Sequence, residues 1–121
     1  MPPHWKKFIK DQGLAGRETE IPESADLSGV GACIEWLDDE GSRSEREDLY
    51  PGIAVAKLGY IPVGGCSIGT GDPYFIREAD GEGGALYRIY HDEVREDGFV
   101  SQQAIAVVLP DYRLVAKFKN A

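Results

Sequence analysis

The sequence predicts a single α+β domain with a mostly antiparallel or mixed sheet flanked by helices. An amphipathic pattern opens the chain, short aromatic and β-branched runs separated by glycine-rich turns fill its middle, and an apolar run followed by a helical pattern closes it. Because helices and strands do not alternate regularly, a sheet of repeated parallel strand–helix units is not predicted. The 121 residues suit one domain, spanning 1–121.

Helices are predicted where apolar side chains recur with a period near 3.6 residues. The predicted helices cover residues 5–13, 53–58 and 110–118. In the second of them, Pro51 lies in the first turn and Gly59 lies just past the end, which is the usual placement of these two residues. The acidic stretch 38–48 is predicted to be a solvated helix or loop.

Strands are predicted where β-branched and aromatic residues gather or alternate with polar ones. They cover residues 31–37, 60–63, 74–76, 86–91 and 104–109, and one more short strand is expected within 18–28. The runs 74–76 and 86–91 flank a glycine-rich turn, which predicts an antiparallel hairpin. Since Pro62 has no N–H to donate, the run 60–63 is expected at a sheet edge or at a strand start.

The charge of the chain is unevenly distributed. The net charge is −8, but residues 18–97 hold 19 acids and only 6 bases, whereas the two ends together are basic. An acidic surface repels a nucleic-acid backbone and steers basic partners toward itself. The charge therefore favours a basic protein partner over nucleic acid. An acidic surface also keeps a small protein in solution, so charge alone does not decide between partner binding and solubility.

The sequence predicts neither membrane association nor secretion. No apolar run approaches the roughly 20 residues that span a bilayer, and the first residues lack the apolar segment of a secretory signal. A cytoplasmic location is therefore expected. Cys33 and Cys66 do not form a C-x-x-C motif, so neither a disulfide framework nor a zinc ribbon is predicted.

Residues 65–69 match the G-x-S-x-G pattern of a nucleophile elbow, with Ser67 as its serine. His91, together with Asp72 or Asp80, would complete a triad. The elbow requires a helix directly after the serine, whereas the strand pattern 74–76 follows here. We therefore expect no enzyme and no catalytic residue, and keep a small serine hydrolase using Ser67 only as an alternative.

No cofactor or metal site is predicted. The glycine-rich stretch 64–71 has two glycines at Walker A spacing, but Thr70 and Gly71 stand where a lysine and a serine or threonine are required. We expect these glycines to shape a tight loop. The residues that could ligate a metal do not match zinc-ligand spacing; they are Cys33, Cys66, Asp72 and His91.

Five segments in a fixed order resemble the SMI1/KNR4 (SUKH) family. They are 50–53 (YPGI), 60–64 (YIPVG), 69–76 (GTGDPYFI), 86–92 (LYRIYHD) and 112–118 (YRLVAKF). The resemblance covers about the last 70 residues. The N-terminal third departs from the family pattern, and Tyr90 stands where the family usually has a tryptophan.

The resemblance implies an α+β fold and a protein-binding role without catalysis. Bacterial members of this family are often immunity proteins that cover the active surface of a cognate toxin, and fungal members act in cell-wall signalling. We therefore expect a protein that neutralises a basic toxin domain, with a regulatory or scaffold protein lacking a toxin partner as the alternative. The expected contact residues surround the acidic stretch and the glycine-rich turns: Glu45, Glu47, Asp48, Asp72, Tyr74, Glu78 and Asp80.

Overall fold

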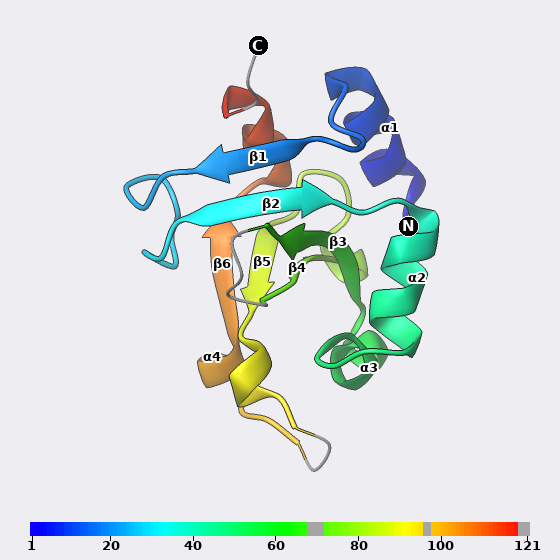
Figure 1. Cartoon of the computed structure of the whole chain (residues 1–121), viewed down its shortest axis with the longest axis vertical. Coiled ribbons are helices and arrows are strands. Elements are labelled where there is room, and N and C mark those ends of the chain that lie inside the picture. The colour runs from blue at the N-terminus through cyan, green and yellow to red at the C-terminus, as the bar shows by residue number, and fades with distance from the viewer. Residues whose placement is uncertain (68–71, 96–97, 119–121) are drawn as a thin grey trace.

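The computed structural model describes residues 1–67, 72–95 and 98–118. Within these ranges the chain forms one curled antiparallel sheet in which each strand pairs with the next, in the order β1-β2-β3-β4-β5-β6 (Figure 1). The strands are β1 (Glu18–Ile21), β2 (Ala32–Trp36), β3 (Tyr60–Cys66), β4 (Tyr74–Arg77), β5 (Leu86–Ile89) and β6 (Ile105–Leu109). The predicted α+β class is confirmed, and the sheet is antiparallel throughout.

Helices lie before, between and after the strands. The α-helices are α1 (Pro3–Gln12), α2 (Asp39–Glu47), α3 (Gly52–Val55) and α4 (Ser101–Ala104). The 3-10 helices are η1 (Ala56–Leu58), η2 (Glu78–Asp80), η3 (His91–Glu93) and η4 (Tyr112–Lys117). Over the described ranges, no helix has the length and apolar character needed to cross a membrane.

Several predicted elements are confirmed. The helix at 5–13 is α1, the acidic stretch 38–48 forms α2, and the helix at 53–58 is the pair α3 and η1. Gly59 ends η1 in the left-handed conformation with φ of 86°, as expected for a terminal glycine. The closing helix is a 3-10 helix, on which the buried Tyr112 and Val115, three residues apart, lie on one face.

The expected position of the strand around Pro62 is wrong. β3 lies inside the sheet between β2 and β4, and Pro62 is its third residue. The register of β3 against β4 shifts between Pro62 and Gly64, and the Pro62 carbonyl accepts a hydrogen bond from Ser42 Oγ of α2 at 2.6 Å. Pro62 precedes the residues of β3 that pair with β2, 64–66, and its carbonyl faces α2, so no neighbouring strand requires the missing N–H on that side. The hydroxyl contact ties α2 to the sheet.

The glycine-rich stretch is also partly different from the expected loop. Residues 64–66 belong to β3, residue 67 follows the strand, and residues 68–71 lie outside the described residues. At Gly64 an added Cβ would lie 2.4 Å from Ile34 Cγ2 of the neighbouring strand. Glycine is therefore required here by close packing inside the sheet.

Both faces of the sheet are covered by apolar side chains. On one face, Trp5 of α1 packs 5.6 Å from Trp36 and 5.1 Å from Tyr112, measured between ring centroids. On the other face, Phe75 and Ile89 belong to a smaller apolar cluster that also includes residues of α3 and α4. The curled sheet thus separates two small cores.

The contact between α2 and α3 offers a test of the packing. A Cβ added to Gly52 would lie 1.8 Å from the Glu45 carbonyl oxygen, whereas a Cβ on Gly65 meets no heavy atom within 4 Å. We expect Gly52→Ala to lower the free energy of unfolding by at least about 2 kcal/mol, since backbone must move. Gly65→Ala should leave stability nearly unchanged. Urea denaturation of both variants measures the difference, and equal stabilities would contradict this packing.

Candidate functional site

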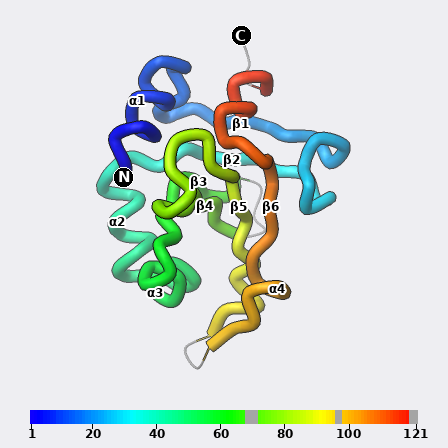
Figure 2. Tube along the Cα trace, turned by 180° about the vertical axis from the view of Figure 1, so that it is seen from behind, coloured from blue at the N-terminus to red at the C-terminus, as the bar shows by residue number. Residues whose placement is uncertain are grey.

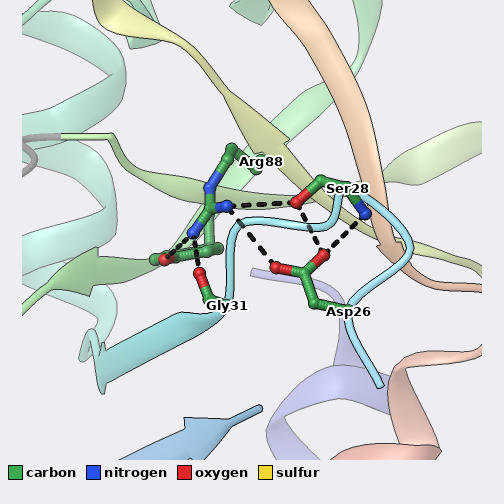
Figure 3. Close-up of polar contacts among 5 residues, drawn as sticks. Asp26, Ser28, Gly31 and Arg88 are labelled. Atoms are coloured by element: carbon green, nitrogen blue, oxygen red, sulfur yellow. Dashed lines mark hydrogen bonds and ion pairs between the residues drawn. The ribbon is translucent and has the colours of Figure 1, made fainter. Parts of the chain in front are cut away.

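Arg88 of β5 lies at the centre of a buried polar network, with only 1% of its surface exposed. Its Nη2 donates to the Gly31 carbonyl at 2.6 Å and to the Tyr74 hydroxyl at 2.7 Å (Figure 3). Its Nη1 donates to Ser28 Oγ at 3.1 Å and lies 3.4 Å from Asp26 Oδ2. A guanidinium removed from water needs several acceptors, and here four of them surround it.

The loop 22–31 is held by this network. Asp26 is itself buried, and its Oδ1 accepts hydrogen bonds from the Ser28 N–H at 2.7 Å and from Ser28 Oγ at 2.6 Å. The Leu27 N–H donates to the Val108 carbonyl of β6 at 2.9 Å. The loop that joins β1 to β2 is therefore fixed to β4, β5 and β6, on the far side of the curled sheet (Figure 2).

Sequence reasoning did not identify this network. Its signal in the sequence is Arg88 itself, a charged residue between apolar neighbours in a strand pattern, where a buried guanidinium needs an acidic partner. Nothing in the sequence selects Asp26 as that partner among 21 acids. The network holds a loop that exposes Leu27 to 65%, so a buried ion pair positions an apolar side chain in solvent.

His91 lies at the start of η3 between two carboxylates. Its Nδ1 is 2.6 Å from Asp72 Oδ1, and its Nε2 is 3.0 Å from Asp92 Oδ1. The same Asp72 oxygen accepts the backbone N–H of His91 at 2.9 Å. The hydrogen bond to Asp72 raises the pKa of His91 above its ordinary value.

Of the three residues of the triad considered in the sequence, the structure joins His91 to Asp72 but gives Ser67 no hydrogen bond to His91. Both ring nitrogens of His91 contact aspartates, and Ser67 Oγ is buried without a hydrogen-bond partner among the described residues. Asp80 lies in η2 and accepts a hydrogen bond from the Tyr87 hydroxyl at 2.7 Å. Within the described ranges no group of three or more His, Cys, Asp or Glu residues is arranged to hold a metal ion.

Comparisons with protein-family models, with curated proteins and with solved structures found no match to this chain. The SMI1/KNR4 resemblance therefore stays a prediction that depends on the five segments named above.

The predicted contact residues fall into three places. Glu45, Glu47 and Asp48 lie in the second half of α2 and at its end, and burial raises the pKa of Glu45. Glu78 and Asp80 lie in η2. A pocket of about 330 Å³ is lined by both Arg46 and Glu78, so the structure brings the end of α2 close to η2.

Two of the predicted contact residues lie elsewhere. Asp72 is partly buried beside His91, apart from the α2 group. Tyr74 is fully buried, and its hydroxyl accepts the hydrogen bond from Arg88, so its expected place on the surface is corrected to the core. The sequence places Tyr74 beside an acidic turn, which favours an exposed position. In the structure its hydroxyl instead accepts a hydrogen bond from the buried Arg88.

The structure adds exposed apolar residues that the sequence did not single out. Leu49, Tyr50 and Leu58 have exposed fractions between 40% and 48%, and they lie in the segment that runs from α2 through α3 to η1. The Glu78 N–H donates to the Gly59 carbonyl at 2.8 Å, which places η2 beside this segment. We call the set Glu47, Asp48, Leu49, Tyr50, Leu58 and Glu78 the corner patch.

Removing the buried guanidinium should destabilise the protein strongly. Arg88→Met would leave the Asp26 carboxylate buried without its cation, a loss that typically costs about 3–5 kcal/mol. Amide exchange in the loop 22–31 should also accelerate. Arg113→Met is the matched control, because it breaks an exposed arginine–aspartate pair and should change stability little. Equal losses in the two variants, measured by urea denaturation, would contradict a special role for Arg88.

The raised pKa of His91 should depend on its hydrogen bond to Asp72. Because the folded pKa of His91 is raised, its contribution to stability is complete below the unfolded pKa and is lost as pH rises through the folded pKa. Asp72→Asn should lower the pKa of His91 toward its ordinary value, whereas Asp11→Asn should not change it. Proton NMR titration of the imidazole measures both; an unchanged His91 pKa in Asp72→Asn would refute the pairing.

Proposed function

We propose that this protein is a non-enzymatic binding module that neutralises a bacterial toxin domain, and that the corner patch contacts the toxin. The observation that carries the proposal is the group of exposed apolar side chains, Leu49, Tyr50 and Leu58, with carboxylates beside it. These three side chains belong to one segment, 49–58, and exposed apolar side chains gathered on one part of a small protein commonly mark a binding site. The SMI1/KNR4 resemblance supports the choice of a toxin as partner.

The composition of the corner patch suits a protein interface. Tyrosine is enriched among the residues that dominate binding energy, and leucine side chains supply apolar area around it. Tyr50 is held between the end of α2 and the start of α3, where the Ile53 N–H donates to the Leu49 carbonyl at 2.9 Å. A fixed backbone lowers the entropy that the side chains lose on binding.

The charge of the corner patch favours a basic partner. Glu47 and Asp48 are exposed at the end of α2, and Glu78 is exposed in η2. A toxin domain that cleaves nucleic acid needs a basic surface to bind the phosphate backbone. An acidic patch that covers this surface would exclude the nucleic acid, and association would be faster at low ionic strength.

The alternatives differ in the support they receive. A regulatory or scaffold protein without a toxin partner would use the same corner patch and differs only in the identity of the bound protein. For the serine hydrolase, the pairing of His91 with Asp72 fits a triad, but Ser67 Oγ is buried without a hydrogen bond to His91, and Asp92 lies against the Nε2 that the serine would need. We therefore do not propose a hydrolytic activity.

The proposal is tested with the products of the genes that flank the gene of this protein, by co-purification and then by titration calorimetry with any toxin domain found among them. Tyr50→Ala should weaken binding roughly tenfold or more, because it removes a central aromatic contact. Asp48→Lys should weaken binding and reduce its salt dependence. Glu93→Lys is the matched control, since it makes the same charge change at an exposed residue of η3 outside the corner patch.

If Glu93→Lys weakens binding as much as Asp48→Lys, the effect belongs to net charge and the corner patch is not the contact. Absence of binding to any neighbouring gene product would contradict a toxin partner. Inhibition of the toxin by the unaltered protein, lost in Tyr50→Ala, is the result that we expect.

A further inference from the structure

β1 is the outermost strand of the sheet, paired on one side with β2 (Figure 1). The direction of its backbone groups follows from the hydrogen bonds of β2. The Cys33 carbonyl accepts from the Ser67 N–H at 3.1 Å, and the Leu37 N–H donates to the Val63 carbonyl at 3.0 Å. The odd-numbered residues of β2 therefore direct their backbone groups toward β3, and the even-numbered ones toward β1.

The same alternation fixes β1. The Trp36 N–H donates to the Arg17 carbonyl, and the register pairs Thr19 with Ile34. Arg17 and Thr19 thus point their backbone groups at β2, and Glu18 and Glu20 point theirs outward. Among the described residues these outward N–H and carbonyl groups have no backbone partner. The edge offers two donors and two acceptors in the spacing of a strand.

The side chains along this edge are acidic. Glu18 and Glu20 are exposed, whereas Thr19 and Ile21 between and after them are buried. In the register, Glu18 lies directly opposite Glu35 of β2. Like charges in directly opposed positions destabilise a pair of strands, and no described cation is bonded to these three carboxylates.

The acidic row determines which strand the edge can accept. A second copy of this chain paired through its own β1 would place glutamates opposite glutamates, so charge opposes self-association. A strand with lysine or arginine at alternate positions would place cations beside Glu18 and Glu20 on the same face. Its backbone would at the same time complete the unpaired hydrogen bonds.

We propose that the outer edge of β1 binds an extended basic segment of another protein as an added antiparallel strand. The recognition elements are the outward backbone groups of Glu18 and Glu20 and the carboxylates of Glu18, Glu20 and Glu35. The corner patch shares no residue with this edge, and in Figure 1 β1 lies in the upper part of the view while α3 lies at the lower right, so the inference is independent of the corner patch. The segment gains affinity from the main chain and selectivity from charge.

The test uses a capped nine-residue peptide of alternating lysine and valine added to the isotope-labelled protein. Amide exchange followed by NMR should slow about tenfold or more at Glu18 and Glu20 when the peptide is in excess, because their N–H groups enter hydrogen bonds. A peptide with glutamate in place of lysine should not slow exchange. A lysine–valine peptide with a central proline should also fail, since it cannot complete the strand.

Variants separate backbone pairing from charge. Glu20→Pro removes an outward N–H that β2 does not use, and should lower peptide affinity at least about tenfold while the sheet persists. Glu20→Gln keeps the N–H and should weaken affinity less, with a smaller salt dependence. The chemical shifts of β2 report whether the sheet persists in each variant.

The proposal is overturned if the lysine–valine peptide leaves the exchange of Glu18 and Glu20 unchanged, or binds Glu20→Pro as tightly as the unaltered protein. Should Glu20→Pro fail to fold, the exchange measurement on the unaltered protein decides the question. No toxin domain is used, so failure here leaves the proposal for the corner patch intact. Conversely, peptide binding at β1 would stand even if the neighbouring toxin did not bind.

Discussion

The buried guanidinium of Arg88 is the interaction on which the arrangement of the sheet depends. Transfer of a charge from water to the interior is costly, and the cost is offset only when acceptors and an opposite charge are in place. Here the acceptors come from β4 and from the loop 22–31, which includes the buried Asp26. The sheet must therefore curl far enough to bring its first loop over its fifth strand.

The two binding surfaces that we propose differ in how the fold presents them. The corner patch is a set of side chains on short helices, where a tyrosine and two leucines provide contact area. The β1 edge presents backbone groups with a row of carboxylates and almost no apolar area. Both favour a basic protein, which agrees with the excess of acids between residues 18 and 97. Thus the same charge bias suits both of the proposed surfaces.

Features that depend on residues close together in the sequence could be predicted, and features that depend on residues far apart could not. The hairpin of β4 and β5, the end of η1 at Gly59 and the helix α1 depend on neighbouring residues, and all were predicted. The contact between Asp26 and Arg88 joins residues 62 positions apart, and no local pattern reports it. Tyr74 was misplaced for the same reason, because its burial depends on Arg88. Among the candidate contact residues, the acids of α2 and η2 were proposed from the composition of the sequence. Leu49 and Leu58 could be added only once the structure showed that their side chains are exposed.

The consecutive pairing of the strands has a consequence for synthesis on the ribosome. Each strand finds its partner in the one that emerged just before it, so the sheet can assemble progressively with short loop closures. The loop 22–31 is different, because its acceptors can pair with Arg88 only after β5 has been synthesised. The aromatic contact of Trp5 with Tyr112 can form only after nearly the whole chain has been synthesised. The nascent chain therefore keeps Asp26 in water without its arginine, and Trp5 without its contact to Tyr112, until the last third of the chain has left the exit tunnel.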